Sequence, residues 1–178
     1  MDIGIFIDDY VKVITDKARL DKAKLDKAKA DIVSKHVKAT YVPYETKVAE
    51  AKNILNFCCY DKDGKFRIDS TLRYVLFIKV VVTLYTDLEW NAENFMIQFD
   101  LMEQYKIIDE ILKEIGDDVQ SFETVLAMVY DDIVTNERSL LSRIESLINS
   151  AKVTFDGLLD ELSNNKELTD LIDKLNRK

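Results

Sequence analysis

The sequence predicts a mainly α fold, a helical bundle with a long N-terminal helix and a small β-hairpin insertion. Four Gly and one Pro among 178 residues leave few enforced breaks, which favours long helices over a many-turned β fold. Apolar residues also recur at helical spacing along most of the chain. We expect three parts: a long N-terminal helix or arm (1–42), a helical body (43–163) with the hairpin near 57–69, and a short C-terminal helix (164–178).

The N-terminal part combines an apolar helical face with a polar repeat. Residues 3–14 place apolar side chains on one face, whereas residues 16–33, DKARLDKAKLDKAKADIV, repeat an Asp-Lys-Ala pattern with a period near five. Each repeat turns a helix by roughly 500°, so the Asp residues spiral around it. Strong helix formers predict one helix from about residue 4 to 39. With so little to bury, residues 16–31 are expected to project as an arm or to pair between subunits.

The middle of the chain predicts a helix, a hairpin and a buried helix. Pro43 ends or redirects the first helix, and residues 44–56 form a short second one. The segment NFCCYDKDGKFRIDS has aromatic and branched runs around a turn sequence, which indicates a hairpin. Asp69 or Ser70 can cap the next helix. Residues 71–88 are apolar nearly all round. A buried strand fits their β-branched run, but their length and the preceding cap favour a buried helix. The expected core residues there are Val75, Leu76, Ile78, Val82 and Tyr85.

The C-terminal half predicts more helix. Residues 94–115 form a helix broken near Gln104, Gly116 ends it, and Asp117–Asp118 begin the next. From residue 119 to 162, either one long helix or two helices that bend near Asn136 fit the apolar stripe. The stripe comprises Val125, Met128, Val129, Ile133, Leu140, Leu141, Ile144, Leu147 and Ile148.

The charge distribution points to interaction with proteins. Residues 12–52 carry eleven Lys or Arg against six Asp or Glu, whereas residues 53–178 carry fourteen against twenty-four. A basic arm on an acidic body suits head-to-tail self-assembly or two partners of opposite charge; two solvated helix faces of different composition are the simpler interpretation. The candidate interaction residues are Lys17, Arg19, Lys22, Lys24, Lys27 and Lys29. Because Asp residues interleave with these cations, nucleic acid is not expected as a partner.

The residues that carry most enzyme chemistry are scarce. His36 is the only histidine, which argues against a histidine triad or a His-based zinc site. Cys58 and Cys59 are adjacent, poor geometry for an ordinary disulfide, and are expected to be buried small hydrophobes. Aligning Gly64 with the invariant glycine of a calcium loop puts Cys59 and Ser70 where carboxylates are needed, so the hairpin turn is preferred. We expect no enzyme activity, no cofactor, no metal and no small-molecule substrate.

Clustered carboxylates leave one enzymatic alternative. Asp117–Asp118, Asp131–Asp132, Asp109, Glu110 and Glu137 could hold Mg²⁺ or Mn²⁺ if the helices brought them together. Solvated faces and helix N-termini account for the same residues more simply. The start MDIGIFIDDYV does not have the character of a secretory signal, and the most apolar run, 75–85, is too short for a membrane span.

Three segments resemble small helical proteins of tailed bacteriophages: ATYVPYETKVAEAKNIL (39–55), RYVLFIKVVVTLYTDLEW (73–90) and VLAMVYDDIVTNERS (125–139). The resemblance implies a structural component of a virion, such as a head–tail connector or a tail protein, found in the virion or the host cytoplasm. We therefore expect a non-enzymatic structural or adaptor protein of a multi-subunit assembly, with protein partners and homo-oligomers. The alternative is an acidic phage-encoded inhibitor of a host nucleic-acid-binding defence protein, because carboxylates can imitate phosphate charge.

Overall fold

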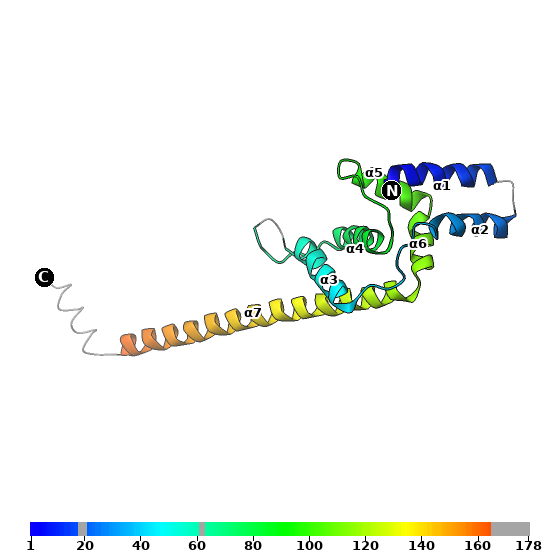
Figure 1. The fold of residues 1–178 in the computed structure, drawn as a ribbon. Coiled ribbons are helices and arrows are strands. Elements are labelled where there is room, and N and C mark those ends of the chain that lie inside the picture. Colours follow the sequence, from blue (N-terminus) through cyan, green and yellow to red (C-terminus); the bar gives the residue numbers. More distant parts are fainter. Residues whose placement is uncertain (18–20, 61–62, 165–178) are drawn as a thin grey trace. The chain divides into compact units, whose positions relative to one another are not determined.

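The computed structural model describes residues 1–17, 21–60 and 63–164, with side chains given through residue 149 and at residue 152. The chain divides into two units, with the boundary between Asp131 and Asp132. In the described part every regular element is a helix (Figure 1): α1 (Ile3–Lys17), α2 (Lys22–Val33), α3 (Tyr44–Cys58), α4 (Ser70–Tyr85), α5 (Phe95–Gln104), α6 (Ile107–Ile115) and α7 (Asp117–Asn164). The predicted mainly helical fold is confirmed.

The first unit buries one face of each helix around a common core. Helix α6 contacts α2, α4 and α5, while α1 packs on α2 and α5, and α3 packs on α4. The first turns of α7 complete this core, because Phe122 is fully buried with its ring centroid 5.3 Å from that of Phe77. The largest side chains with almost no exposure are Tyr10, Tyr85, Phe6, Phe122, Ile3, Leu55, Ile78 and Met102.

The predicted continuous N-terminal helix is wrong. Helices α1 and α2 are separate and lie side by side (Figure 1). Asp21 has an extended backbone (φ −61°, ψ 155°) and caps α2 by accepting a hydrogen bond from the Lys24 amide at 3.0 Å. A short Asp side chain competes for backbone amides and so favours a helix start over a helix interior. Turning back lets α2 bury Ala28 and Val33, which a projecting helix would leave in water.

The predicted β-hairpin is not seen in the described residues. Helix α3 continues through Cys58 and takes up the residues expected to form the first strand. One antiparallel backbone pair, Tyr60 with Phe66, remains, and the two rings meet edge to face at 5.8 Å. The returning chain is held by the Arg67 and Asp69 amides, which donate to the carbonyls of Cys59 and Cys58, each at 2.8 Å. Residues 61–62 of the proposed turn lie outside the described residues.

Several predicted boundaries are confirmed. Asp69 caps α4 by accepting from the Leu72 amide at 2.8 Å, and residues 70–85 are helix, not strand. The break near Gln104 lies at Tyr105–Lys106, where Lys106 has a left-handed backbone (φ 60°). Gly116 ends α6 at φ 78°, a value that L residues with a side chain rarely adopt. Of the two options for residues 119–162, the single long helix is correct. Leu76, expected in the core, is only half-buried.

Candidate functional site

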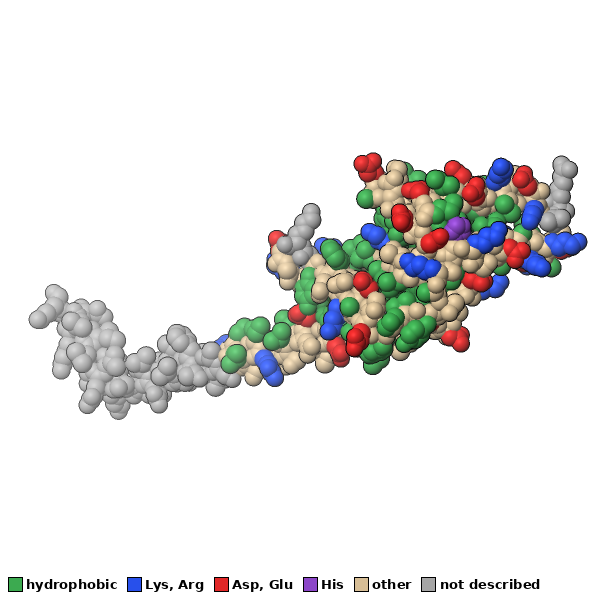
Figure 2. Space-filling model, in the orientation of Figure 1, with side chains coloured by type: hydrophobic (Ala, Val, Ile, Leu, Met, Phe, Trp, Pro, Cys, Tyr) green, Lys and Arg blue, Asp and Glu red, His purple; other side chains and the backbone are tan. Residues whose placement is uncertain are grey.

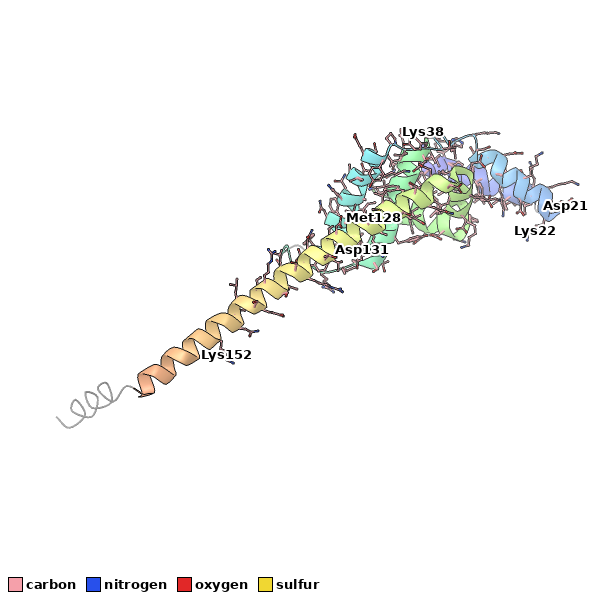
Figure 3. All side chains as sticks on the ribbon, turned by 90° about the horizontal axis from the view of Figure 1, so that it is seen from below. Asp21, Lys22, Lys38, Met128, Asp131 and Lys152 are labelled. Atoms are coloured by element: carbon pink, nitrogen blue, oxygen red, sulfur yellow. The ribbon has the colours of Figure 1, made fainter. Side chains whose placement is uncertain are left out.

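The predicted basic arm belongs to the packed pair α1–α2 and not to a projecting segment. Lys17 is the last residue of α1, and Lys22 the first of α2 at the tip of the pair (Figure 3). Lys17, Lys22, Lys24 and Lys27 are exposed and Lys29 is half-buried, while Arg19 lies outside the described residues. The described lysines therefore sit on a folded helix pair.

Local carboxylates offset part of the arm's charge. Lys24 forms an ion pair with Asp21 at 3.1 Å, and both side chains are more than half exposed. The Lys24 amide, the first cause, and the Lys24 ammonium both hold the pKa of Asp21 below its ordinary value. Exposed pairs of this kind contribute little to stability. Nothing in the arrangement of these lysines indicates a particular ligand.

A buried polar network joins three elements of the first unit, and sequence reasoning missed it. Lys47 on α3 is 2% exposed, and its Nζ donates to Asp118 Oδ1 at 2.6 Å and to Ser121 Oγ at 3.2 Å. Asp118 Oδ2 accepts from the Tyr85 hydroxyl at 2.7 Å and from the Val42 amide at 2.9 Å. Both oxygens of the carboxylate are thus engaged.

The network's protonation states are fixed by these contacts. Burial alone would raise the pKa of Asp118, but the hydrogen bonds from Lys47, Tyr85 and the Val42 amide outweigh it and lower that pKa. Burial, and then the bond to Asp118, raise the pKa of Tyr85. The carboxylate stays ionised at neutral pH and the phenol stays protonated. Because Lys47 and Tyr85 are almost fully covered, this arrangement ties α3, α4 and α7 together and offers no open reactive group.

A signal for Lys47 was present in the sequence. Lys47 lies four residues before Ala51, so it shares the inward face of α3 with Ala51, Ile54, Leu55 and Cys58. A lysine within an apolar helical stripe needs a buried acceptor. The sequence could not say that Asp118, and not the exposed Asp117, supplies it.

The cysteines and the histidine have structural environments. Cys58 and Cys59 are free and buried, with their sulfur atoms 4.0 Å apart, as the prediction of small buried hydrophobes requires. Burial, with the neighbouring Cys59, raises the pKa of the Cys58 thiol to about 12, so it is protonated at neutral pH. His36 is half-buried: its Nδ1 lies 2.8 Å from Asp87 Oδ1, and its ring meets Phe6 at 5.0 Å.

The described residues do not bring the candidate carboxylates together into a site for Mg²⁺ or Mn²⁺. Among those residues, no three His, Cys, Asp or Glu side chains are grouped so as to hold a metal ion. Asp109 and Glu110 lie in the first turn of α6 near Lys106 and Lys113, and Asp131 and Asp132 are exposed on α7. No helix within the described ranges is both long and apolar enough to cross a membrane.

A shallow groove with mostly apolar walls lies between α3 and α4 in the first unit. It has a volume of about 350 Å³, and its walls include Ile54, Phe57, Leu76, Val80 and Leu84. Phe57 is 73% exposed at its rim. The polar side chains there are Glu50, Asn53, Lys79 and Thr83. Nothing in its chemistry selects one class of ligand.

The strongest candidate for a binding surface is the apolar face of α7 beyond the first unit. We call it the α7 face and define it as Leu140, Leu141, Ile144, Leu147 and Ile148, each between 52% and 70% exposed. Every residue from Arg138 to Asn149 is exposed in this chain. At about 100° per residue the five side chains span about 120° of the helix surface. Hydrophobic side chains are visible on this part of the helix in Figure 2.

Exposure of this face is unfavourable for an isolated chain. Burying a Leu or Ile side chain that is otherwise in water contributes roughly 1.5–3 kcal/mol. Contiguous apolar surface on a soluble protein marks an interaction site more often than a single exposed side chain does. The face therefore suits a partner that covers it. Comparison of the chain with protein-family models, curated proteins and solved structures finds no match.

Proposed function

We propose that this protein is a non-enzymatic assembly or adaptor protein that acts through protein–protein contacts made by the α7 face. The observation that carries the proposal is the run of five large apolar side chains, all more than half exposed, on one side of a long helix. In contrast, the ionisable groups of the buried network are bonded to one another and almost fully covered, with side-chain exposures of 3% for Lys47 and 12% for Asp118.

The shape of the apolar surface favours a helix as the occupant. A stripe of about 120° along a helix is the pattern by which amphipathic helices pack on helices or lie in hydrophobic grooves. A small-molecule site would instead be concave and would enclose most of its ligand. The partner proposed here thus presents an apolar helix or groove.

We propose more specifically that the protein is a virion component such as a head–tail connector or tail protein, and that it works in the virion or the host cytoplasm. This proposal rests on the sequence resemblance to phage proteins and on a helix that carries an exposed apolar face beyond the first unit. Neighbouring genes for portal, capsid or tail proteins would support it. Binding to a host nucleic-acid-binding protein that survives loss of the α7 face would favour the acidic inhibitor.

The test compares two variants that add the same charge to opposite sides of α7. Ile144→Asp puts a carboxylate at the centre of the α7 face, whereas Ser142→Asp puts one about 160° away. Light scattering after size exclusion measures the mass of the full chain, alone and with the products of neighbouring genes. We expect complexes with the native chain and Ser142→Asp, and loss of these complexes with Ile144→Asp. Equal masses for all three in every mixture would contradict the proposed function.

A further inference from the structure

The two edges of the α7 face differ in character. Leu140 and Leu147, spaced seven residues apart, form one edge, and both are more than half exposed. Beyond the opposite edge lie Arg138, Glu145 and Lys152, again seven residues apart and exposed. Seven residues make nearly two turns, so each set stays on one side of the helix. The face is apolar on one flank and charged on the other.

The charged flank alternates in sign. Asp131 continues the same spacing toward the N-terminus, so the order along α7 is Asp131, Arg138, Glu145 and Lys152, negative and positive in turn. Figure 3 labels Asp131 and Lys152 at the two ends of this series. An alternating series of this kind is complementary to its own reverse.

The relative direction of two paired helices decides which flanks meet. In a parallel pair of identical helices, the apolar flank of each meets the charged flank of the other, which would place Leu140 and Leu147 against charges. Turning one helix end for end brings apolar flank to apolar flank and charged flank to charged flank. The antiparallel arrangement is therefore the one that satisfies both edges.

We propose that the α7 face is covered by α7 of a second copy of this chain in antiparallel orientation, an inference that rests on the proposed function. One register places Arg138 opposite Glu145 of the partner subunit and, by symmetry, Glu145 opposite the partner's Arg138. The same register places Asp131 opposite the partner's Lys152. Leu140 then packs against the partner's Leu147 along the other edge.

One further residue fits a defined register. Glu137 falls within the apolar stripe between Ile133 and Leu140 and is half-buried in the single chain. A polar residue inside a coiled-coil seam lowers stability but discriminates among registers. In this register Glu137 lies at the end of the seam, and a slide that carried it to the middle would bury the carboxylate among apolar side chains, which is unfavourable.

The test uses two charge-reversal variants, each of which should dimerise weakly alone and strongly when mixed with the other. Arg138→Glu makes the flank of that chain acidic at both central positions, and Glu145→Arg makes it basic at both. Each variant alone would pair like charges at two symmetric places, so we expect its dimer affinity to fall by about tenfold or more. Mixed in equal amounts, the two full-length variants should form a heterodimer with near-native affinity. Sedimentation equilibrium at low salt measures all three affinities.

The outcomes separate this inference from the proposed function. Raising the salt to 1 M, where the screening length is about 3 Å, should reduce the difference in dimer affinity between each single variant and the equal mixture of the two. A native dimer whose two variants do not pair when mixed would overturn the antiparallel register but leave assembly through the α7 face intact. A native chain that stays monomeric while a different partner binds in an Ile144-dependent way would overturn the self-pairing alone. Heterodimer formation from the mixture supports the proposal.

Discussion

Helix α7 carries apolar side chains in both units of the chain, but in two different environments. Val119, Phe122 and Val125 near its start are at most 4% exposed in the core of the first unit. Leu140, Leu147 and the other members of the α7 face repeat the same helical spacing and are more than half exposed. Periodicity alone thus predicts that a helix has an apolar face, and it does not say which molecule covers that face.

The same helix also carries charged side chains in two different environments. Asp118 has both carboxylate oxygens engaged by Lys47, Tyr85 and the Val42 amide, and its side chain is 12% exposed. Arg138, Glu145 and Lys152 are exposed. Removing one partner of a buried ion pair strongly lowers the free energy of unfolding, because the other charge stays buried without a counter-charge. Exposed charges contribute little to stability and mainly select the orientation and identity of a binding partner. The two regions therefore call for different experiments.

The largest expected effect is at the buried start of α7. Phe122→Ala removes a fully buried ring that contacts Phe77, and we expect it to lower the free energy of unfolding by about 3–5 kcal/mol. Urea unfolding followed by circular dichroism measures the loss. A change below about 1 kcal/mol would mean that this part of α7 does not belong to the core.

A slightly smaller effect is expected at the buried ion pair. Asp118→Asn leaves the Lys47 ammonium buried without a counter-charge, which should cost about 3 kcal/mol, the lower end for such a pair because Asp118 retains some exposure. The matched control is Asp117→Asn in the same first turn of α7. It loses only the favourable interaction with the helix N-terminus, about 0.3–1 kcal/mol. Equal losses of unfolding free energy in the two variants would contradict the claim that Asp118, unlike Asp117, stabilises the fold through a buried ion pair.

The pH dependence of stability sharpens the same comparison. The native pKa of Asp118 is lowered, so its contribution to stability is complete above the unfolded value of about 3.9 and is lost as the pH falls through the native value. The difference in unfolding free energy between the native chain and Asp118→Asn should stay constant near neutral pH and shrink below about pH 4. Urea titrations across this range give the difference directly. A gap that persists unchanged in acid would contradict the role of the ionised carboxylate.

The smallest expected effect on chain stability is at the α7 face. Leu147→Ala in dilute solution should change the unfolding free energy of the first unit by less than about 0.5 kcal/mol, because Leu147 is 70% exposed in the single chain. The same variant should weaken association, since it removes apolar area from the seam. A loss comparable to that of Phe122→Ala in dilute solution would show that Leu147 stabilises the monomer.

Much of the fold could be predicted from local signals. Gly116 and Asp69 act as a helix end and a helix cap because their effects need only neighbouring backbone. The prediction of one continuous N-terminal helix is wrong because the residues of the repeat favour helix throughout, whereas Asp21 starts a new helix that packs on α1 and α6. The predicted hairpin is not seen in the described residues because α3 extends through Cys58, which is buried on its inward face.

The candidate site was harder to predict because it depends on long-range contacts. The pairing of Lys47 with Asp118 joins residues 71 positions apart, and sequence spacing cannot select Asp118 over Asp117. The apolar residues of the α7 face were recognised as part of a stripe, but their exposure follows from where the core of the first unit ends. The lysines of the predicted arm were chosen by charge alone, and their role in binding stays a prediction.

The most direct test of the central claim is the solvent accessibility of the α7 face as the protein concentration rises. Leu147→Cys places a thiol on the face, and Asn149→Cys places one on the far side of the same helix. The native cysteines are buried, and the Cys58 thiol is protonated at neutral pH, so a maleimide should react first with the introduced thiol. We expect the Leu147→Cys reaction to slow as the chains associate while the Asn149→Cys reaction stays fast. Equally fast reaction of both thiols at every concentration would contradict the claim that a second copy covers this face.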